Sequence, residues 1–93
     1  MITPQNIARH ELIGLAVRIA GGPNSELAGL AGRVVDESRN TLTIEAGGSE
    51  KVVPKGGFVF SFRLPKEDRW VKVDGDVIVA RPEDRIKKKQ PKW

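Results

Sequence analysis

Short segments in which apolar residues alternate with other residues, each bounded by turn-forming residues, recur through most of this chain. The clearest is "GFVFSFRL" (57–64), which places Phe58, Phe60, Phe62 and Leu64 on one face. A repeat of two residues is the period of a β-strand, and turn signals about every 8 to 12 residues are typical of all-β sandwiches and barrels. The pattern therefore favours a small antiparallel β structure.

The other predicted strands show the same alternation or end at a turn signal. They fall at 12–20, from Gly29 or Gly32 to Glu37, at 41–46, at 50–55, and at 70–80, where two short strands are predicted to meet in a tight turn at Asp74-Gly75. The first of them places Ile13, Leu15, Val17 and Ile19 on one face, and Gly14 marks a bend.

A chain of 93 residues provides one modest hydrophobic core, so we expect a single domain. About six or seven short strands favour a small closed or half-open antiparallel barrel, because closure removes sheet edges that such a short chain cannot otherwise cover. We expect the barrel at 13–81, an N-terminal helical extension at 1–12, and a basic C-terminal helix or tail at 82–93.

The row of Phe58, Phe60 and Phe62 has two interpretations. It can be an exposed platform on which bases stack, as in proteins that bind single-stranded RNA. It can also be the core of the barrel, and we favour this because the chain has few other large apolar residues.

The net charge of +4 lies entirely in the last segment, "RPEDRIKKKQPKW". Residues 1–80 hold ten basic and ten acidic residues, whereas residues 81–93 hold six basic and two acidic residues. A concentrated positive charge suggests a polyanionic partner such as nucleic acid. We expect arginine, whose planar group can bind a phosphate at two points, to make the specific contacts and the lysine run to make nonspecific ones.

Within this segment, Pro82 suits the first position of a helix, and Glu83 and Asp84 suit its positive N-terminus. Among the isolated basic residues of the rest of the chain, Lys55 stands out, because Gly56 and Gly57 beside it allow a phosphate to approach closely. The candidate nucleic-acid-binding residues are therefore Arg81, Arg85, Lys87, Lys88, Lys89 and Lys55.

We expect no catalytic residue and no metal site in the chain. His10 is the only histidine, and there is no cysteine or tyrosine. The acidic pairs Asp36-Glu37 and Asp74/Asp76 could in principle bind magnesium, but their positions at strand ends are better explained by turn formation.

The chain has no cysteine to form a disulfide, which suits a reducing compartment. Its first residues lack the apolar run of a signal peptide, and no segment approaches the roughly 20 apolar residues of a membrane helix. We expect a cytoplasmic protein with no membrane partner.

Three segments together resemble the archaeal ribonuclease P protein component 1 family. They are "HELIGL" (10–15), "GRVVDESRNTLTIE" (32–45) and "RPEDRIKKK" (81–89). The segment "VVPK" (52–55) and the strand at 60–64 also lie where that family has them. The resemblance covers nearly the whole chain, and the order and spacing of the segments make it specific.

This resemblance implies a strongly bent antiparallel Sm-like or SH3-like barrel. The segment "GGSEKVVPKGG" lacks the glycine-containing second signature of Sm proteins, so no self-assembled ring is implied. The family's reaction is removal of the 5′ leader from precursor tRNA, for which the RNA subunit holds the catalytic Mg²⁺. The resemblance further implies a small zinc-ribbon protein partner, contact with ribonuclease P RNA, and only indirect contact with precursor tRNA.

We therefore expect a noncatalytic RNA-binding subunit of ribonuclease P that is inactive alone. Two alternatives are a free-standing Sm-like or cold-shock-like RNA chaperone and a metal-dependent nuclease that acts alone. Near the predicted N-terminal helix, Ile7 and Leu12 need a covering surface, which we expect to be either the protein partner or the open flank of the barrel.

Overall fold

One antiparallel sheet of six strands forms the body of the protein. The computed structural model describes residues 7, 11–23, 26–65 and 68–80. In sheet order β4-β3-β2-β1-β5-β6, the strands are β4 (Ser49–Pro54), β3 (Thr41–Ala46), β2 (Ala31–Glu37), β1 (Ala16–Gly21), β5 (Val59–Leu64) and β6 (Arg69–Asp74), and the 3-10 helix η2 (Gly75–Ile78) follows β6. The predicted mostly-β class is confirmed.

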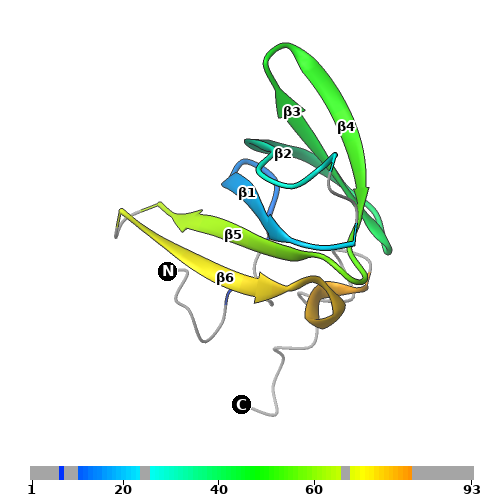
Figure 1. The fold of residues 1–93 in the computed structure, drawn as a ribbon. Coiled ribbons are helices and arrows are strands. Elements are labelled where there is room, and N and C mark those ends of the chain that lie inside the picture. Colours follow the sequence, from blue (N-terminus) through cyan, green and yellow to red (C-terminus); the bar gives the residue numbers. More distant parts are fainter. Residues whose placement is uncertain (1–6, 8–10, 24–25, 66–67, 81–93) are drawn as a thin grey trace.

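The sheet is strongly bent and forms a half-open barrel. Figure 1 shows β2, β3 and β4 turning back over the rest of the sheet, with the end of β4 coming down beside η2. The hydrogen-bonded order is linear, so β4 and β6 are the two edges among the described strands. Register shifts interrupt the pairing of β1 with β5 and of β2 with β3, and such bulges bend and twist the strands that carry them.

The bulge in β2 changes which of its side chains face the core. Val34 pairs with Ile44 on β3, and Glu37 pairs with Leu42, with a register shift between Val34 and Asp36. Two buried residues three apart on β2 thus lie opposite two buried residues only two apart on β3. Without the bulge, alternation would turn Asp36 inward; with it, Glu37 enters the interior.

The phenylalanine row lies in the core, as predicted. Phe58, Phe60, Phe62 and Leu64 are all buried in one cluster of apolar side chains. The ring centroids of Phe60 and Phe62 are 6.0 Å apart, and those of Phe58 and Phe60 are 6.4 Å apart. In this fold the row is therefore not an exposed platform for stacking bases.

The first strand is shorter than predicted. Ile13 is exposed, whereas Leu15, Val17 and Ile19 are buried. Gly14 forms the predicted bend, with a φ of 98°, and its amide donates to the Val34 carbonyl at 2.8 Å. Because of this turn, Ile13 lies outside β1 and does not share the inward face of Leu15, Val17 and Ile19.

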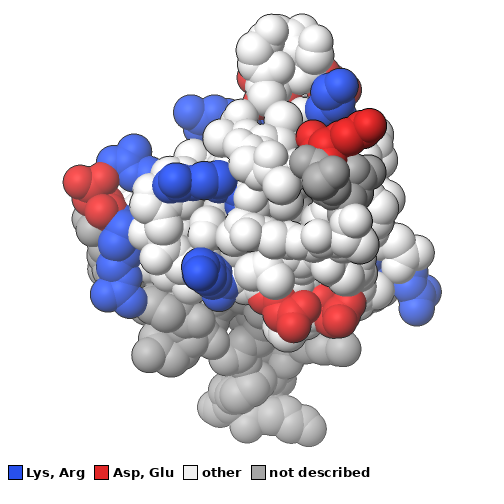
Figure 2. Space-filling view, viewed as in Figure 1, with Lys and Arg blue, Asp and Glu red and all other residues white. Residues whose placement is uncertain are grey.

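The predicted hairpin at Asp74-Gly75 is wrong. Instead of turning back into a second strand, the chain enters η2, where a side-chain oxygen of Asp74 accepts a hydrogen bond from the Asp76 amide at 3.1 Å. Gly75 serves close approach: a Cβ atom there would lie 1.8 Å from the Lys55 carbonyl oxygen. In the space-filling view, acidic side chains gather at the lower right, over the region of η2 (Figure 2).

The predicted terminal helices fall largely outside the described residues. Most of the predicted N-terminal extension at 1–12 and all of the predicted C-terminal helix or tail at 82–93 lie outside the described residues. The described part of the first extension contributes Ile7 and Leu12, which are 3% and 0% exposed and belong to the hydrophobic core. The chain itself therefore covers both side chains.

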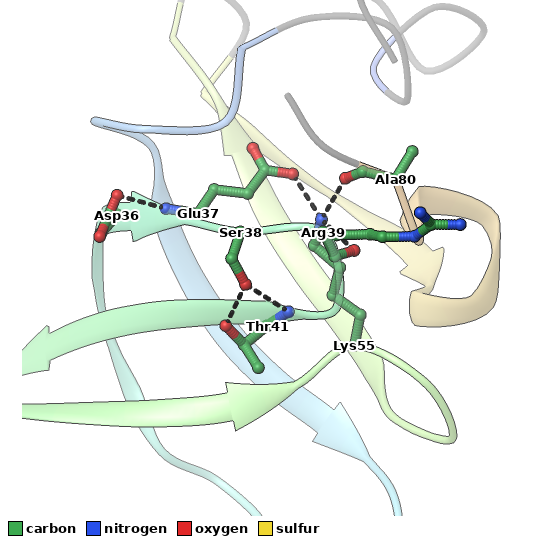
Figure 3. A network of polar contacts seen from close by, with 7 residues as sticks. All are labelled: Asp36, Glu37, Ser38, Arg39, Thr41, Lys55 and Ala80. Carbon is green, nitrogen blue, oxygen red and sulfur yellow. Dashed lines mark hydrogen bonds and ion pairs between the residues drawn. The ribbon is translucent and has the colours of Figure 1, made fainter. Parts of the chain in front are cut away.

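A buried ion pair joins the ends of several elements. The Lys55 Nζ lies 2.7 Å from Glu37 Oε2, and both side chains are 0% exposed (Figure 3). The same Nζ donates to the Arg39 carbonyl at 3.2 Å and to the Ala80 carbonyl at 2.9 Å. These three acceptors match the three donors of an ammonium group. Lys55 thus connects the end of β2, the β2–β3 turn and the residue that precedes Arg81.

This geometry corrects the assignment of Lys55 as an RNA contact. The adjacent glycines suggested an exposed lysine that a phosphate could approach, but the side chain points into the protein and its donors are used. Glycine serves the backbone here, since the Phe58 amide donates to the Lys55 carbonyl at 3.3 Å across the Gly56-Gly57 turn.

We predict that Phe60→Ala lowers the free energy of unfolding by about 3 to 5 kcal/mol, because it removes a fully buried aromatic ring and leaves a cavity. Urea denaturation measures the change. The control is Val52→Ala on β4, where the side chain is 64% exposed and the expected change is within about 0.5 kcal/mol. A Phe60→Ala protein of unaltered stability that fails to bind RNA would contradict this prediction.

We predict that Lys55→Met lowers the free energy of unfolding by about 3 to 5 kcal/mol, because it leaves the Glu37 carboxylate buried without its cation. The double variant Lys55→Met/Glu37→Leu should recover part of the loss, since no buried charge remains. Thermal and urea unfolding of the single and double variants provide the measurement. Lys51→Met, at an exposed position, is the control, and equal stability of Lys55→Met and Lys51→Met would disprove the buried pair.

Candidate nucleic-acid interface

Most of the candidate RNA-binding residues predicted from the sequence belong to the C-terminal segment. Arg81, Arg85, Lys87, Lys88 and Lys89 lie outside the described residues, so their assignment stays a prediction. The structure does describe the residue before them. The Ala80 carbonyl accepts a hydrogen bond from the Lys55 ammonium group, which also donates to the Arg39 carbonyl, so Ala80 lies beside the β2–β3 turn.

The two predicted partner contacts are not on the described surface. Ile7 and Leu12 pack in the core of this chain, which is the second of the two coverings expected for them. Their side chains are therefore unavailable to a protein partner in this conformation. Since Lys55 is also buried, the candidate interface in the described part of the chain has to be formed by other residues.

Basic side chains that sequence reasoning passed over lie on the outer face of the sheet. Arg63 on β5 pairs with Trp70 on β6, and Ser61 on β5 pairs with both Arg18 on β1 and Lys72 on β6. In each strand these residues alternate with buried ones: Val17 and Ile19 flank Arg18, and Phe62 and Leu64 flank Arg63. Strand pairing thus gathers on one face charges that are far apart in the sequence.

A fourth basic residue continues this surface on β2. Arg33 pairs with Ala16 of β1, and its Nη1 donates to the Gly14 carbonyl at 2.7 Å. We call Arg18, Arg33, Arg63, Trp70 and Lys72 the basic face. In Figure 2, Lys and Arg side chains spread over the left and centre of the view, with acidic side chains beside them at the left edge, and the acidic side chains near η2 lie apart at the lower right.

The aromatic member of the basic face is Trp70. Its side chain is partly open to solvent, with 41% of the residue exposed. The Arg18 guanidinium carbon lies 4.1 Å from the centroid of the Trp70 ring, within the range of a cation–π contact. This contact holds an arginine and an exposed aromatic ring together without a carboxylate between them.

Two of the arginines also line a shallow groove of about 200 Å³ at the side of the basic face. Its lining residues are Gly14, Leu15, Ala16, Arg33, Arg63 and Pro65. Arg63 additionally forms an ion pair with Asp68, whose side chain is largely exposed. The groove therefore places two guanidinium groups beside exposed backbone.

The described residues contain no group of three or more His, Cys, Asp and Glu that could hold a metal ion. Of the acidic residues weighed as magnesium ligands, Glu37 is paired with Lys55, while Asp36 accepts a hydrogen bond from the Glu37 amide. Asp74 and Asp76 accept backbone amides at η2 and at Gly57. Within the same residues, no helix has the length and apolar character needed to cross a membrane.

Comparison with known proteins identifies the family. Residues 5–88 match the family described as ribonuclease P/MRP, subunit p29. A ribonuclease P protein component 1 from Methanothermobacter thermautotrophicus is 60% identical over 90 residues, which are 96% of each chain. One from Methanosphaera stadtmanae is 51% identical over 89 residues, which are 96% of this chain and 95% of the relative.

A solved structure agrees with these relatives. Mth11, described as a homologue of the human RNase P protein Rpp29, superimposes with a TM-score of 0.60 at 57% sequence identity. The superposition covers 84% of this chain and all of that one. The family match over nearly the whole chain, the identity of the archaeal relatives and the shared fold confirm the resemblance seen in the sequence: this protein belongs to the ribonuclease P/MRP subunit p29 family.

Proposed function

We propose that this chain is a noncatalytic RNA-binding subunit of ribonuclease P, which supports removal of the 5′ leader from precursor tRNA by the RNA subunit. The observation that carries the proposal is the family match over residues 5–88, together with full-length relatives named as protein components of ribonuclease P. The cations of the described surface and of the C-terminal segment give it the chemistry to contact RNA phosphates.

In this proposal the chain supplies no reacting group. The RNA holds the catalytic Mg²⁺, and the aspartates near η2 accept hydrogen bonds from backbone amides of this chain. The expected partners are ribonuclease P RNA and a small zinc-ribbon subunit, with precursor tRNA contacted only indirectly and with no ring of identical copies. The expected location is the cytoplasm.

Reconstitution tests this function. We predict that the pure chain with Mg²⁺ leaves precursor tRNA intact, and that adding it to ribonuclease P RNA with the remaining protein subunits raises the rate of 5′-leader removal. A particle lacking only this chain is the control. If the chain is a free-standing RNA chaperone, leaving it out should not change the cleavage rate of the particle. If the pure chain cleaves precursor tRNA and Asp36→Asn or Asp76→Asn abolishes the cleavage, the chain is an independent nuclease.

The basic C-terminal segment leads to a quantitative prediction. Truncation after Ile86 removes Lys87, Lys88, Lys89 and Lys92. If all four neutralise phosphates, the slope of log affinity for RNA against log salt concentration should fall by about 3 to 4 units. Thermal stability should barely change, because exposed charges contribute little to folding.

A substitution separates specific from nonspecific contacts in that segment. Arg85→Lys keeps the charge, so the salt slope should stay nearly the same while assembly with the cognate RNA weakens through loss of two-point binding. Unaltered salt dependence after truncation would show that the lysines do not contact RNA. Normal assembly of Arg85→Lys would show that Arg85 contributes charge alone.

A further inference from the structure

Several cations of the basic face form no ion pair within the described residues. Arg63 pairs with Asp68, and Arg33 lies opposite Glu45 of β3 in the strand register without forming an ion pair with it. Arg18 and Lys72 likewise form no ion pair within the described residues. Arg18 instead contacts the Trp70 ring, and Arg33 donates to a backbone carbonyl. An exposed surface with several uncompensated cations favours an anionic ligand.

The positions of these groups are fixed by the sheet. Arg18 and Lys72 lie on either side of Ser61, two strands apart, which places their backbones about 10 Å from each other. Trp70 lies in the neighbouring pair of β5 with β6, directly opposite Arg63. Trp70 is thus bordered by Arg63 across the strands, by Arg18 over its ring, and by Lys72 two residues along β6.

The aromatic ring distinguishes between anionic ligands. A phosphate alone needs only the cations, and the backbone of a duplex presents phosphates while its bases stay stacked inside. A tryptophan that is 41% exposed among cations offers a surface on which an unpaired base can stack while its neighbouring phosphates meet the charges. Acidic protein surfaces provide carboxylates but no such base.

We propose that the basic face of Arg18, Arg33, Arg63, Trp70 and Lys72 binds an unpaired stretch of RNA, with one base stacked on Trp70 and adjacent phosphates at Arg18, Arg63 and Lys72. This rests on the proposed function and deepens it, since it gives the sheet its own RNA contact, separate from the C-terminal segment. Base stacking, considered and not favoured for the phenylalanines, is here assigned to an exposed tryptophan on the opposite face of the same sheet.

The proposal is tested with the full chain and two probes, a 12-nucleotide oligoadenylate and a 12-base-pair RNA duplex. Trp70→Leu should weaken oligoadenylate binding by about 5- to 150-fold, whereas Trp70→Phe should keep most of it because a ring remains. In a Trp93→Phe background, Trp70 is the only tryptophan, so oligoadenylate should quench its fluorescence and the duplex should not.

Charge variants test the phosphate contacts. Arg18→Gln and Lys72→Gln should each lower the salt slope for oligoadenylate by about 0.7. The matched control is Lys51→Gln on β4, at the far edge of the sheet, which removes the same charge and should leave the slope unchanged. Melting temperatures of all variants confirm that they fold.

Several results would overturn the proposal. Folded Trp70→Leu with unaltered binding or absent quenching rules out stacking, and equal binding of both probes rules out a preference for unpaired RNA. If Lys51→Gln and Lys72→Gln lower the salt slope equally, RNA binding depends on the net charge of the protein and not on the basic face. If the variants bind RNA normally but fail to join the other protein subunits, the basic face is a protein interface.

The same experiment separates this proposal from the function on which it rests. If the unaltered chain raises the cleavage rate of the reconstituted particle while the basic-face variants bind RNA normally, only the basic-face proposal fails. If the unaltered chain neither binds ribonuclease P RNA nor affects the particle, the proposed function fails, whatever the variants do.

Discussion

The buried pair of Lys55 and Glu37 is the contact on which the closure of this half-open barrel depends. Among the described strands, hydrogen bonds run from β4 to β6 in one line and do not connect these two edges, so the ladder alone does not join the two ends of the sheet. Lys55 follows β4, and its Nζ reaches the end of β2, the turn after it and the carbonyl of Ala80 beyond η2. Three segments distant in sequence meet at one ammonium group, which stays buried because each of its protons has an acceptor.

Sequence reasoning succeeded where a feature depends on local period. The alternation of Phe58, Phe60 and Phe62 predicts a buried face, and all three side chains are buried in the structure. Phe60, for example, pairs with the buried residues Ile19 and Val73 on its two neighbouring strands. Sequence reasoning failed where the role of a residue depends on a contact with a residue far away in the sequence. The glycine after Asp74 looked like a turn residue, but it is small because the Lys55 carbonyl approaches it, and the Glu37 partner of Lys55 is 18 residues away. Such contacts leave no local pattern to detect.

Composition also concealed the candidate interface. Residues 1–80 are neutral in sum, which directed attention to the C-terminal lysines. The net charge of a chain does not show where its basic and acidic side chains lie in the folded protein. Strand pairing brings Arg18, Arg63 and Lys72 onto one face. Asp74 and Asp76 lie at η2, where their carboxylates accept hydrogen bonds from backbone amides. A domain without net charge can therefore have a distinctly positive side.

The bulge in β2 has a consequence for how the sequence of this strand can vary. Val34 and Glu37 are three residues apart, and both face inward only because β2 has one more residue between them than β3 has between their partners Ile44 and Leu42. A one-residue deletion between them would remove the bulge and restore strict alternation with Glu37 still facing inward, so Lys55 would keep its carboxylate but β2 would lose the extra bend and twist that the bulge gives it. Closing the bulge without a deletion would instead present Asp36 to the interior and leave Lys55 without its carboxylate. The same extra residue thus brings Glu37 to Lys55 and bends the sheet, and substitutions at the outward Val35 leave both effects in place.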